Sequence, residues 1–484
     1  MRDPGRILIV GAGPTGLGAA RRLRELGHED HLLLEAAEGP GGLATSFVDS
    51  QGFTWDVGGH VQFSHYAYYD AVLAREVSGD WIEHDRESWV WLCGRWIPYP
   101  FQYNLHRLPD AERDRALLGL ERAAAAPARV ATSFADWIES TFGDGIAEQF
   151  MVPYNLKVWG YPLAEIGIDW MGERVAVPDL ARVRRNIATG ADDVGWGPNR
   201  RFRFPARGGT GHIWRDVAAA LPRERLRYRA AVAAVDLGGR ALRLASGEWL
   251  RYDTLVSTMP LDLLVDRSLD AGADLRNASA GLLHSSVHVI GVGLLGGRPP
   301  ALARKCWMYF PDPSSPYFRV TVFSNYSPYH VPEGDDFWSL LVEVCESPHR
   351  RVDAGGLAAE VIAALRRDGL VTADSAIASV WQHRAEHGYP TPFRGRDEIL
   401  ARLRPALEES RVFSRGRFGA WLYEVSNQDH SFMQGVEVVD RLLGTGDEPT
   451  LERAVWVNGG ALAERAAQAL AGGAPAAEAP EDRV

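Results

Sequence analysis

The chain has 484 residues, of which 46% are hydrophobic and 24% are charged, as in ordinary globular proteins with a large core. Its formal net charge of −11 argues against nucleic acid or an anionic membrane as a general partner. No apolar run approaches the roughly 18 residues of a membrane span. The three cysteines are scattered and never form a CxxC pair, and there is no signal peptide, so we expect a cytoplasmic protein without a disulfide or metal scaffold.

The first chemical signal lies in residues 6–23, RILIVGAGPTGLGAARRL. An apolar strand, a GxGxxG turn and an amphipathic helix follow one another, which is the context in which this motif indicates dinucleotide binding. Gly11 permits the tight turn, Gly13 lets a pyrophosphate approach the backbone, and Gly16 lets the helix pack on the strand. Glu35 ends the next predicted strand, 24 positions after Gly11, near the roughly 20 expected of an acid that binds a ribose.

The residues after Glu35 favour FAD over NAD. The sequence continues AAEGPGGLA, with a Gly-Gly pair at Gly41 and Gly42, which resembles flavoenzymes of the amine-oxidase and glutathione-reductase type. The loop DVGGHV, residues 56–61, suggests a backbone that approaches the flat isoalloxazine ring. From these residues alone, a simple turn before a strand is equally consistent.

Further along, the apolar pattern alternates between helical and extended stretches. Helices are predicted over 109–126, from Ser133 onward, and over 145–150, 356–367 and 434–443. Strands are predicted over 232–235, 241–244, 254–257, 287–292, 307–310, 318–323 and 338–344. These stretches divide the chain into 1–104, 105–198 (helical), 199–268, 269–410 (sheet), 411–472 and a disordered tail, 473–484.

Twelve motifs then identify a family: GAGPTGLGAA, GGLA, DVGGHVQFSHY, PYPFQ, FMVPYNLKVW, GERVAVP, FRFPARGGTG, KCWMYFP, FSNYSPY, HGYPTP, SRGRFGAW and NQDHSFM. They run in order to about residue 435, and in them the chain resembles the FAD-dependent UDP-galactopyranose mutases, most closely the eukaryotic type. The resemblance implies an α/β fold. A discontinuous Rossmann-like FAD domain (1–104, 199–268, 411–472) would carry an inserted helical domain and an antiparallel-sheet substrate domain.

The resemblance also implies a reaction. Such mutases interconvert UDP-galactopyranose and UDP-galactofuranose, and the flavin must be reduced although no net oxidation occurs. N5 of the flavin attacks the anomeric carbon, expels UDP and forms a covalent flavin–sugar adduct. The protein has to position the anomeric carbon and hold the leaving pyrophosphate. NADH or NADPH is the expected reductant and, without a second GxGxxG context, would bind without a domain of its own.

Site residues follow from the motifs by resemblance. Arg174 and Arg319 resemble the two pyrophosphate arginines, and His60 resembles a loop histidine that shifts with the flavin redox state. Hydroxyl donors to the phosphates would be Tyr309, Tyr389 and Tyr423. The uracil and ribose pocket would be Tyr99, Phe101, Gln102, Phe150, Tyr154, Asn155 and Trp159. The sugar and flavin surroundings would be Asn199, Trp307, Tyr326, Arg417 and Asn427. FAD contacts would be Gly11, Gly13, Thr15, Gly16, Glu35, Gly42, Leu43, Gly59, Val232, Arg417 and Gln428.

Three positions depart from the eukaryotic pattern: Leu422 replaces an arginine, Ser426 a glycine and Val152 an arginine. Ser426 lies beside the sugar pocket and Val152 beside the base pocket, so another hexose or another nucleotide (a 6-deoxy sugar, or one carried by dTDP or GDP) remains an alternative. An amine-oxidase-like oxidase and a non-catalytic flavin scaffold are less favoured, since the predicted pocket is rich in arginine.

Overall fold

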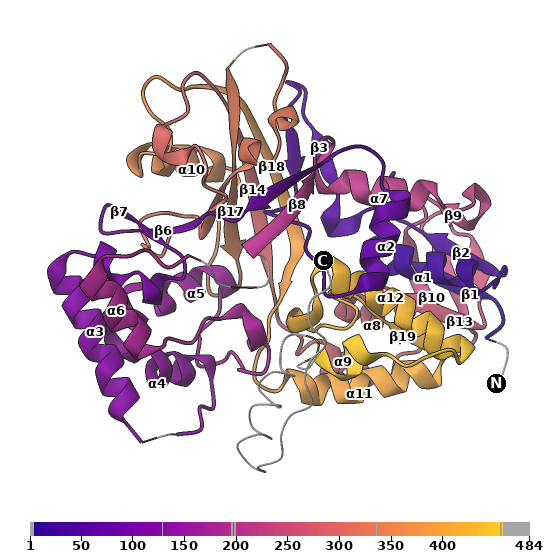
Figure 1. Ribbon diagram of the computed structural model, residues 1–484. Coiled ribbons are helices and arrows are strands. Elements are labelled where there is room, and N and C mark those ends of the chain that lie inside the picture. The colour runs from indigo at the N-terminus through magenta and orange to yellow at the C-terminus, as the bar shows by residue number, and fades with distance from the viewer. Residues whose placement is uncertain are drawn as a thin grey trace.

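The computed structural model describes residues 4–127, 129–194, 197, 200–334, 336–454 and 457. Figure 1 shows a parallel sheet with its helices on the right, a tall sheet at the top, and a group of helices at the lower left. These parts correspond to the FAD, sheet and helical domains that the sequence predicts. The predicted tail, 473–484, falls outside the described residues.

The parallel sheet has five strands in the order β19-β13-β1-β2-β9. Its strands are β1 (Ile7–Val10), β2 (His31–Leu34), β9 (Leu226–Arg227), β13 (Thr254–Ser257) and β19 (Val412–Ser414). All four residues of β1 are apolar and buried, as expected of a parallel strand with helices on both faces. Three separate stretches of chain therefore build one sheet, which makes this domain discontinuous.

Helices cover both faces of that sheet. Ile7 and Ile9 of β1 face a core shared with α1 (Pro14–Glu25), α2 (Ala67–Glu76), α7 (Gly209–Ala219) and α12 (Gln428–Leu443). Leu8 and Val10 face the opposite core, with α8 (Leu261–Arg267) and α11 (Arg396–Glu409). Because side chains alternate between the two faces of β1, this strand packs against helices on both sides.

Helices α1 and α12 pack closely against each other at two glycines, Gly18 and Gly435. A Cβ on Gly18 would overlap the carbonyl oxygen of Phe432, and one on Gly435 would overlap that of Thr15. The two backbones can therefore approach without side chains between them. This contact fixes the start of α12 beside the GxGxxG turn that precedes α1.

The tall sheet has seven strands in the order β18-β14-β17-β16-β15-β6-β7. They are β6 (Ser88–Leu92), β7 (Arg95–Pro98), β14 (His284–Leu295), β15 (Trp307–Tyr309), β16 (Arg319–Val322), β17 (Phe337–Glu346) and β18 (Ala376–Pro390). All adjacent pairs are antiparallel except β15 with β6, which is parallel. Helix α10 (Leu357–Arg367) packs on one face, and Phe53 and Trp55 pack on the other, over Gly293 and Gly291.

Strands β6 and β7 differ from their expected place. They precede the predicted boundary at residue 104, yet they extend the sheet whose other strands come from residues 284–390. Pairing of β6 with β15 explains this position, because a long-range parallel pair leaves no local sequence signal. The other domain boundaries stay predictions.

The helical part contains α3 (Asp110–Ala125), α4 (Phe134–Ile146), a π-helical turn (Ala147–Met151), α5 (Val152–Trp159) and α6 (Leu180–Thr189). The predicted capping signal is confirmed, since the Ser133 hydroxyl accepts a hydrogen bond from the Asp136 amide, as an N-cap should. Gly143 has φ +71° and packs directly on the backbone of Gly119, which holds α3 and α4 close together.

The remaining elements connect these parts. They are β3 (Ser46–Val48) with β4 (Thr54–Asp56), β5 (Trp81–Asp85) with β8 (Arg201–Pro205), the antiparallel group β10 (Val232–Asp236), β11 (Ala241–Leu244) and β12 (Trp249–Arg251), and α9 (Ala273–Ser279) and α13 (Pro449–Glu452). The predicted helix 434–443 begins earlier, at Gln428.

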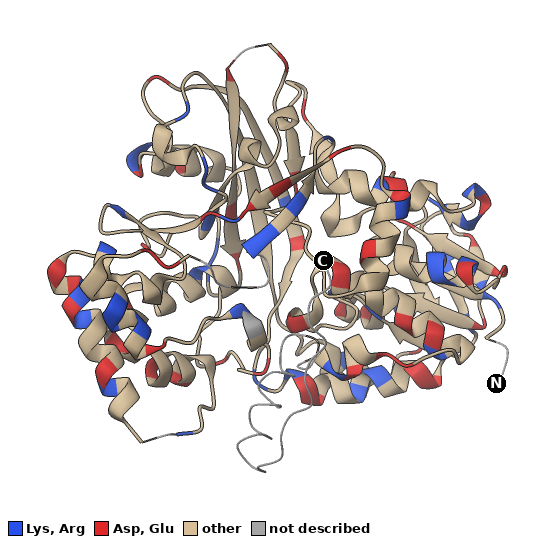
Figure 2. Cartoon of the chain, in the orientation of Figure 1, with Lys and Arg blue, Asp and Glu red and all other residues tan. Residues whose placement is uncertain are grey.

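Figure 2 shows charged residues of both signs interspersed along the outer helices α3, α6 and α11, whereas the strands of the tall sheet carry few. Among the described residues, no helix combines the length and the apolar character needed to cross a bilayer.

Candidate active site

Two glycine turns form one end of the site. At the first, the carboxylate of Glu35 accepts hydrogen bonds from the amides of Ala12 (2.6 Å) and Ala37 (2.8 Å). Gly11 has φ +98°, and a Cβ on Gly16 would overlap its carbonyl oxygen. Glu35 therefore braces the turn, and its geometry requires the first and third glycines of the motif, Gly11 and Gly16.

Helix α1 begins at this turn without a side-chain cap and without an acid in its first turn. Its N–H groups and the positive end of its dipole are therefore available to an anion. The second turn, at Gly41 (φ +117°) and Gly42 (φ +54°), lies alongside: the Gly41 amide donates to the Ala12 carbonyl at 2.9 Å. A Cβ on Gly13 would lie 3.8 Å from the Gly41 carbonyl oxygen and would narrow the gap between the turns.

A single cavity of about 690 Å³ runs from these turns to the helical part. It is lined by most of the predicted site residues, namely Gly11, Gly13, Thr15, Glu35, Gly42, Leu43, Gly59, His60, Tyr99, Gln102, Phe150, Tyr154, Asn155, Trp159, Arg174, Trp307, Tyr309, Arg319, Tyr389, Arg417, Tyr423, Asn427 and Gln428. All three parts of the fold contribute to its wall. The cavity begins at the GxGxxG turn and ends at the aromatic helix α5.

Four of the described predicted residues do not line the cavity, and a fifth is not among the described residues. Gly16 packs inside the first turn, and Val232 lies in β10, where its carbonyl accepts a hydrogen bond from Arg267. Phe101 is fully buried and stacks behind Phe150. Tyr326 is fully buried in another aromatic cluster, and Asn199 falls outside the described residues.

Besides Arg86, three arginines line the cavity and bring positive charge into it. Arg319 forms a two-pronged ion pair with the buried carboxylate of Glu343, at 2.6 and 2.7 Å. Arg174 donates to the carbonyl of Glu424 at 2.7 Å and lies over the ring of Tyr423. Arg417 donates to the Gly388 carbonyl and to the Ser426 hydroxyl, both at 2.8 Å.

The positive charge is only partly compensated. Burial, together with the charges of Arg174 and Arg319, lowers the pKa of Arg417. Glu343 neutralises the guanidinium group of Arg319, whereas Arg174 and Arg417 donate to backbone carbonyls and a hydroxyl, which carry no charge. An anionic ligand between these arginines would therefore gain electrostatic energy in a partly desolvated place.

Aromatic side chains form the wall opposite the glycine turns. The ring of Tyr309 meets those of Tyr99 and Tyr154 edge-on, each at 5.3 Å, and Phe150 stacks on Tyr154 at 5.2 Å. Burial raises the pKa of Tyr389 to about 12 and raises that of Tyr309. Both hydroxyls consequently stay protonated at neutral pH and can donate hydrogen bonds.

The predicted histidine loop lines the cavity and contacts Glu343, the ion-pair partner of Arg319. Gly58 has φ +104°, and a Cβ on Gly59 would lie 3.0 Å from Nε1 of Trp307, so the backbone passes too close for a side chain. Burial and the positive charges of Arg417 and Arg319 lower the pKa of His60 to about 3. His60 is therefore neutral at physiological pH.

With this geometry in place, comparison with known proteins is decisive. The family of flavin-containing amine oxidoreductases matches residues 14–443. A solved structure of a reduced UDP-galactopyranose mutase is 47% identical, with a TM-score of 0.91, and the alignment covers 94% of this chain and 97% of that one. The chain belongs to the UDP-galactopyranose mutase family.

Two solved structures of lower identity show the fold alone, and one curated relative matches a short stretch of sequence. A putative protoporphyrinogen oxidase from Exiguobacterium sp. 255-15 is 16% identical over 92% of this chain and 100% of its own, with a TM-score of 0.67. A putrescine oxidase is 15% identical over 91% and 99%, with a TM-score of 0.63. A 15-cis-phytoene desaturase from Glycine max is 34% identical over 84 residues, which are 17% of this chain and only 15% of that relative.

As a member of these families the chain is a flavoprotein, and its residues fit FAD. The uncapped start of α1 suits the pyrophosphate. The gap between Gly13 and the Gly41 turn would be narrowed by a Cβ, so glycine leaves room there for the cofactor. A second uncapped helix start, at Asn427 of α12, also borders the cavity, and a helix N-terminus there suits the negative charge of a reduced flavin. The starts of α1 and α12 thus both match the group.

The mutase cavity also contains residues that sequence reasoning missed. Arg86, Thr258, Glu343, His387 and Asp429 line it, and Arg86 lies over the ring of Trp307 at 5.9 Å. Arg86 stands in no recognisable motif. Glu343 had a usable signal, since it is a single acid within the apolar run FWSLLVEVC, where a charge needs a buried partner.

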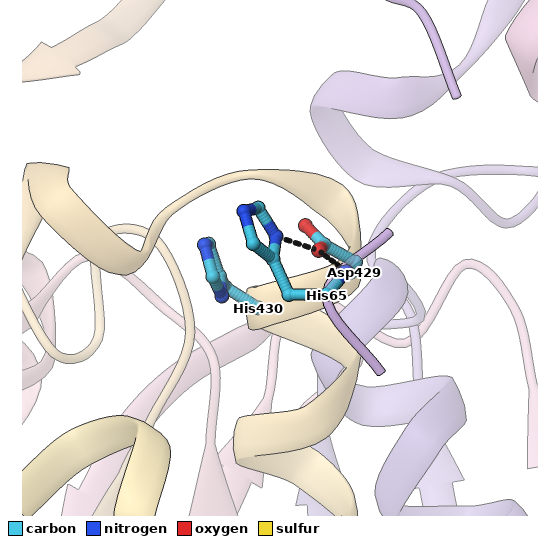
Figure 3. A group of neighbouring side chains, drawn as sticks. All are labelled: His65, Asp429 and His430. Atoms are coloured by element: carbon cyan, nitrogen blue, oxygen red, sulfur yellow. Dashed lines mark hydrogen bonds and ion pairs between the residues drawn. The ribbon is translucent and has the colours of Figure 1, made fainter. Parts of the chain in front are cut away.

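Asp429 belongs to a histidine cluster next to the cavity (Figure 3). His65 Nδ1 and the Asp429 carboxylate lie 2.7 Å apart, and the rings of His65 and His430 stack at 4.6 Å. Tyr66 links His430 Nδ1 to the Thr450 hydroxyl, each contact being 2.8 Å. The cluster joins the loop after His60 to the start of α12 through hydrogen bonds.

A second cluster, Asp262, His284 and His387, reaches the cavity through His387. His387 Nε2 lies 3.0 Å from the Asp262 carboxylate, and the two imidazoles stack at 4.1 Å. In both clusters the ligating atoms lie within 4.8 Å of one another, but the carboxylate in each is already paired with a histidine. We interpret both as hydrogen-bonded supports of the cavity wall.

Proposed function

We propose that this protein is a flavin-dependent mutase that interconverts UDP-galactopyranose and UDP-galactofuranose and is active when its FAD is reduced. The observation that carries the proposal is one cavity in which an FAD cradle, three arginines and an aromatic wall meet. A close relative at 47% identity is a UDP-galactopyranose mutase, which supports the same reaction here.

FAD held in this cavity would supply, when reduced, an electron pair for displacement of the nucleotide from the anomeric carbon. The chain's own part is to hold both reactants. The turns at Gly11 and Gly42 and the braced carboxylate of Glu35 hold the dinucleotide, while Gly59 and His60 lie next to the expected flavin ring. A neutral His60 adds no further positive charge there.

Arg174 and Arg319 would hold the departing diphosphate. Guanidinium groups match phosphate oxygens in geometry and do not lose their charge, and the hydroxyls of Tyr309, Tyr389 and Tyr423 would add neutral donors. Stabilising the leaving group in a partly buried site lowers the barrier to its departure. Arg417 and Asn427 also line the cavity, and they would border the sugar.

The base and ribose would lie against α5. Phe150 and Tyr154 present stacked faces, with Trp159 and Tyr99 alongside in the cavity wall. The amide nitrogens of Gln102 and Asn155 donate to the carbonyls of Ala176 and Met151, at 2.5 and 2.7 Å. Their amide oxygens can therefore accept hydrogen bonds from a uracil.

Another nucleotide hexose remains the second candidate, favoured by Ser426 and Val152. Ser426 lines the cavity at a place where the family pattern has glycine, and a changed polar group can alter which sugar is preferred. An amine-oxidase activity has less support, because the relatives with that activity are only 15% identical and the arginines would have no ligand. We further infer a cytoplasmic enzyme that uses NADH or NADPH as reductant.

The test is to incubate dithionite-reduced protein with UDP-galactopyranose, dTDP- and GDP-linked hexoses and a 6-deoxy nucleotide sugar. Furanose products are identified by chromatography and NMR. A furanose formed fastest from UDP-galactopyranose supports the proposal. A faster reaction with another nucleotide sugar supports the second candidate, and oxygen consumption with simple amines but no furanose contradicts both.

A further inference from the structure

Glu343 is a buried acid in the middle of an otherwise apolar strand. It lies in β17, only 2% of its surface is exposed, and its partner in the neighbouring strand β16 is Arg319. Apolar residues Val342 and Val344 flank it and are buried in the sheet core. A carboxylate in such a place is costly unless charged or N–H donors surround it.

Its donors come from two different functional elements. Oε1 accepts hydrogen bonds from Arg319 Nε at 2.6 Å and from the Gly59 amide at 3.2 Å, while Oε2 accepts from the other prong of Arg319 at 2.7 Å. A Cβ on Gly58 would lie 3.3 Å from Oε2, so the loop backbone lies directly against the carboxylate. One side chain therefore contacts both the proposed diphosphate arginine and the loop beside the flavin.

This arrangement makes the two sites energetically dependent on each other. A diphosphate drawn to Arg319 competes with Glu343 for the same guanidinium, and the carboxylate must then rely more on the Gly59 amide. Removing one partner of a buried ion pair is strongly unfavourable. If Arg319 moves away from Glu343, the Gly59 loop must therefore shift to keep the carboxylate hydrogen-bonded. The contact is also reciprocal, since linkage requires each site to affect the other equally.

We infer that Glu343 is a positioning residue that couples diphosphate binding at Arg319 to the loop formed by Gly58, Gly59 and His60. This inference rests on the proposed function, because it takes the ligand of Arg319 to be a nucleoside diphosphate. In the wild-type holoenzyme, flavin reduction changes UDP affinity, and UDP in turn changes the flavin environment. Glu343 transmits both effects.

The experiment measures UDP binding to oxidised and to dithionite-reduced holoenzyme by anaerobic calorimetry, and follows the flavin absorption difference spectrum during the titration. Wild type is compared with Glu343→Gln, which removes the charge, and with Glu343→Asp, which keeps the charge but withdraws the carboxylate. The control is Glu346→Gln on the same strand, which pairs with Arg384 and His288 outside the cavity.

For wild type and the control we expect the two dissociation constants to differ by roughly fivefold or more, the lower end of ordinary couplings, and to agree within about twofold in both Glu343 variants. The UDP-induced difference spectrum should shrink in parallel, while flavin content stays as in wild type. Retention of the wild-type ratio in a folded, flavin-loaded Glu343 variant overturns the inference alone. Failure of the wild type to bind UDP overturns the proposed function, and the inference with it.

Discussion

The hydroxyl of Ser426 accepts a hydrogen bond from Arg417 at 2.8 Å and donates one to the carbonyl of Tyr423 at 2.8 Å. The side chain that departs from the family pattern therefore holds an arginine of the cavity. The sequence places Ser426 beside the sugar pocket, and the structure shows that its hydroxyl hydrogen is used within the chain. Any effect on sugar choice should then pass through Arg417.

Ser426→Gly should change the relative kcat/KM values for UDP-galactopyranose and two other nucleotide hexoses more than it changes UDP affinity. The variant removes a hydrogen bond to a charged group, worth about 1.5–3 kcal/mol, and leaves Arg174 and Arg319 intact. Ser426→Thr keeps the hydroxyl and serves as the control. An unchanged sugar ranking in the glycine variant would remove Ser426 as a specificity position.

Arg174→Ala and Arg319→Ala should each weaken UDP binding by roughly ten- to a hundredfold, because each loses a charge-assisted contact worth about 1.5–3 kcal/mol. Their stabilities should differ. Arg319→Ala leaves the buried Glu343 without its ion pair, which costs about 3–5 kcal/mol, whereas Arg174 gives up one bond to a backbone carbonyl. Calorimetry and thermal unfolding measure the two effects, with the exposed Arg185→Ala as control. Equal stability of both variants would argue against the Glu343 pair.

Gly13→Ala and Gly16→Ala separate flavin binding from folding. A Cβ on Gly13 meets nothing closer than 3.8 Å, while one on Gly16 would overlap the Gly11 carbonyl. We therefore expect Gly13→Ala to fold with a wild-type circular dichroism spectrum but to lose most of its FAD, and Gly16→Ala to be destabilised. Gly39→Ala, which meets nothing within 4 Å, is the control. Full flavin occupancy in Gly13→Ala would contradict the proposed position of the pyrophosphate.

His60 should make the protein more sensitive to acid. Its pKa falls to about 3 in the folded protein because of burial and the charges of Arg417 and Arg319, against about 6.5 in the unfolded chain. Between these values the unfolded state binds a proton that the folded state excludes, so stability falls as pH decreases from 6.5. At pH 5 the loss is at most about 2 kcal/mol, at 1.36 kcal/mol per pH unit.

The measurement is the drop in thermal midpoint from pH 7 to pH 5. His60→Gln should show a smaller drop than wild type, and the exposed His349→Gln should show the wild-type drop. A drop in His60→Gln as large as that in wild type would mean that the imidazole takes up a proton in the folded protein after all.

Local patterns in the sequence predicted the strand, turn and helix at the start of the parallel sheet. The buried run before Gly11 and the amphipathic residues after it placed β1 and α1, because periodicity and turn chemistry act over a few residues. The resemblance of the motifs to the family predicted most of the residues that line the cavity. Contacts between residues far apart in the sequence could not be predicted from it. Arg319 and Glu343 pair between the neighbouring strands β16 and β17, and His65 contacts Asp429, 364 positions later. The place of β6 and β7 in the tall sheet depends on such a pairing as well.

The most direct test of the central claim uses one substrate and two redox states. The FAD-loaded protein is incubated with UDP-galactopyranose under anaerobic conditions, once oxidised and once reduced with dithionite, and the products are analysed by NMR. N5 of an oxidised flavin is electron-poor, and reduction would make it nucleophilic, so UDP-galactofuranose should form in the reduced sample alone. Equal turnover in both samples, or no furanose in either, would contradict the claim.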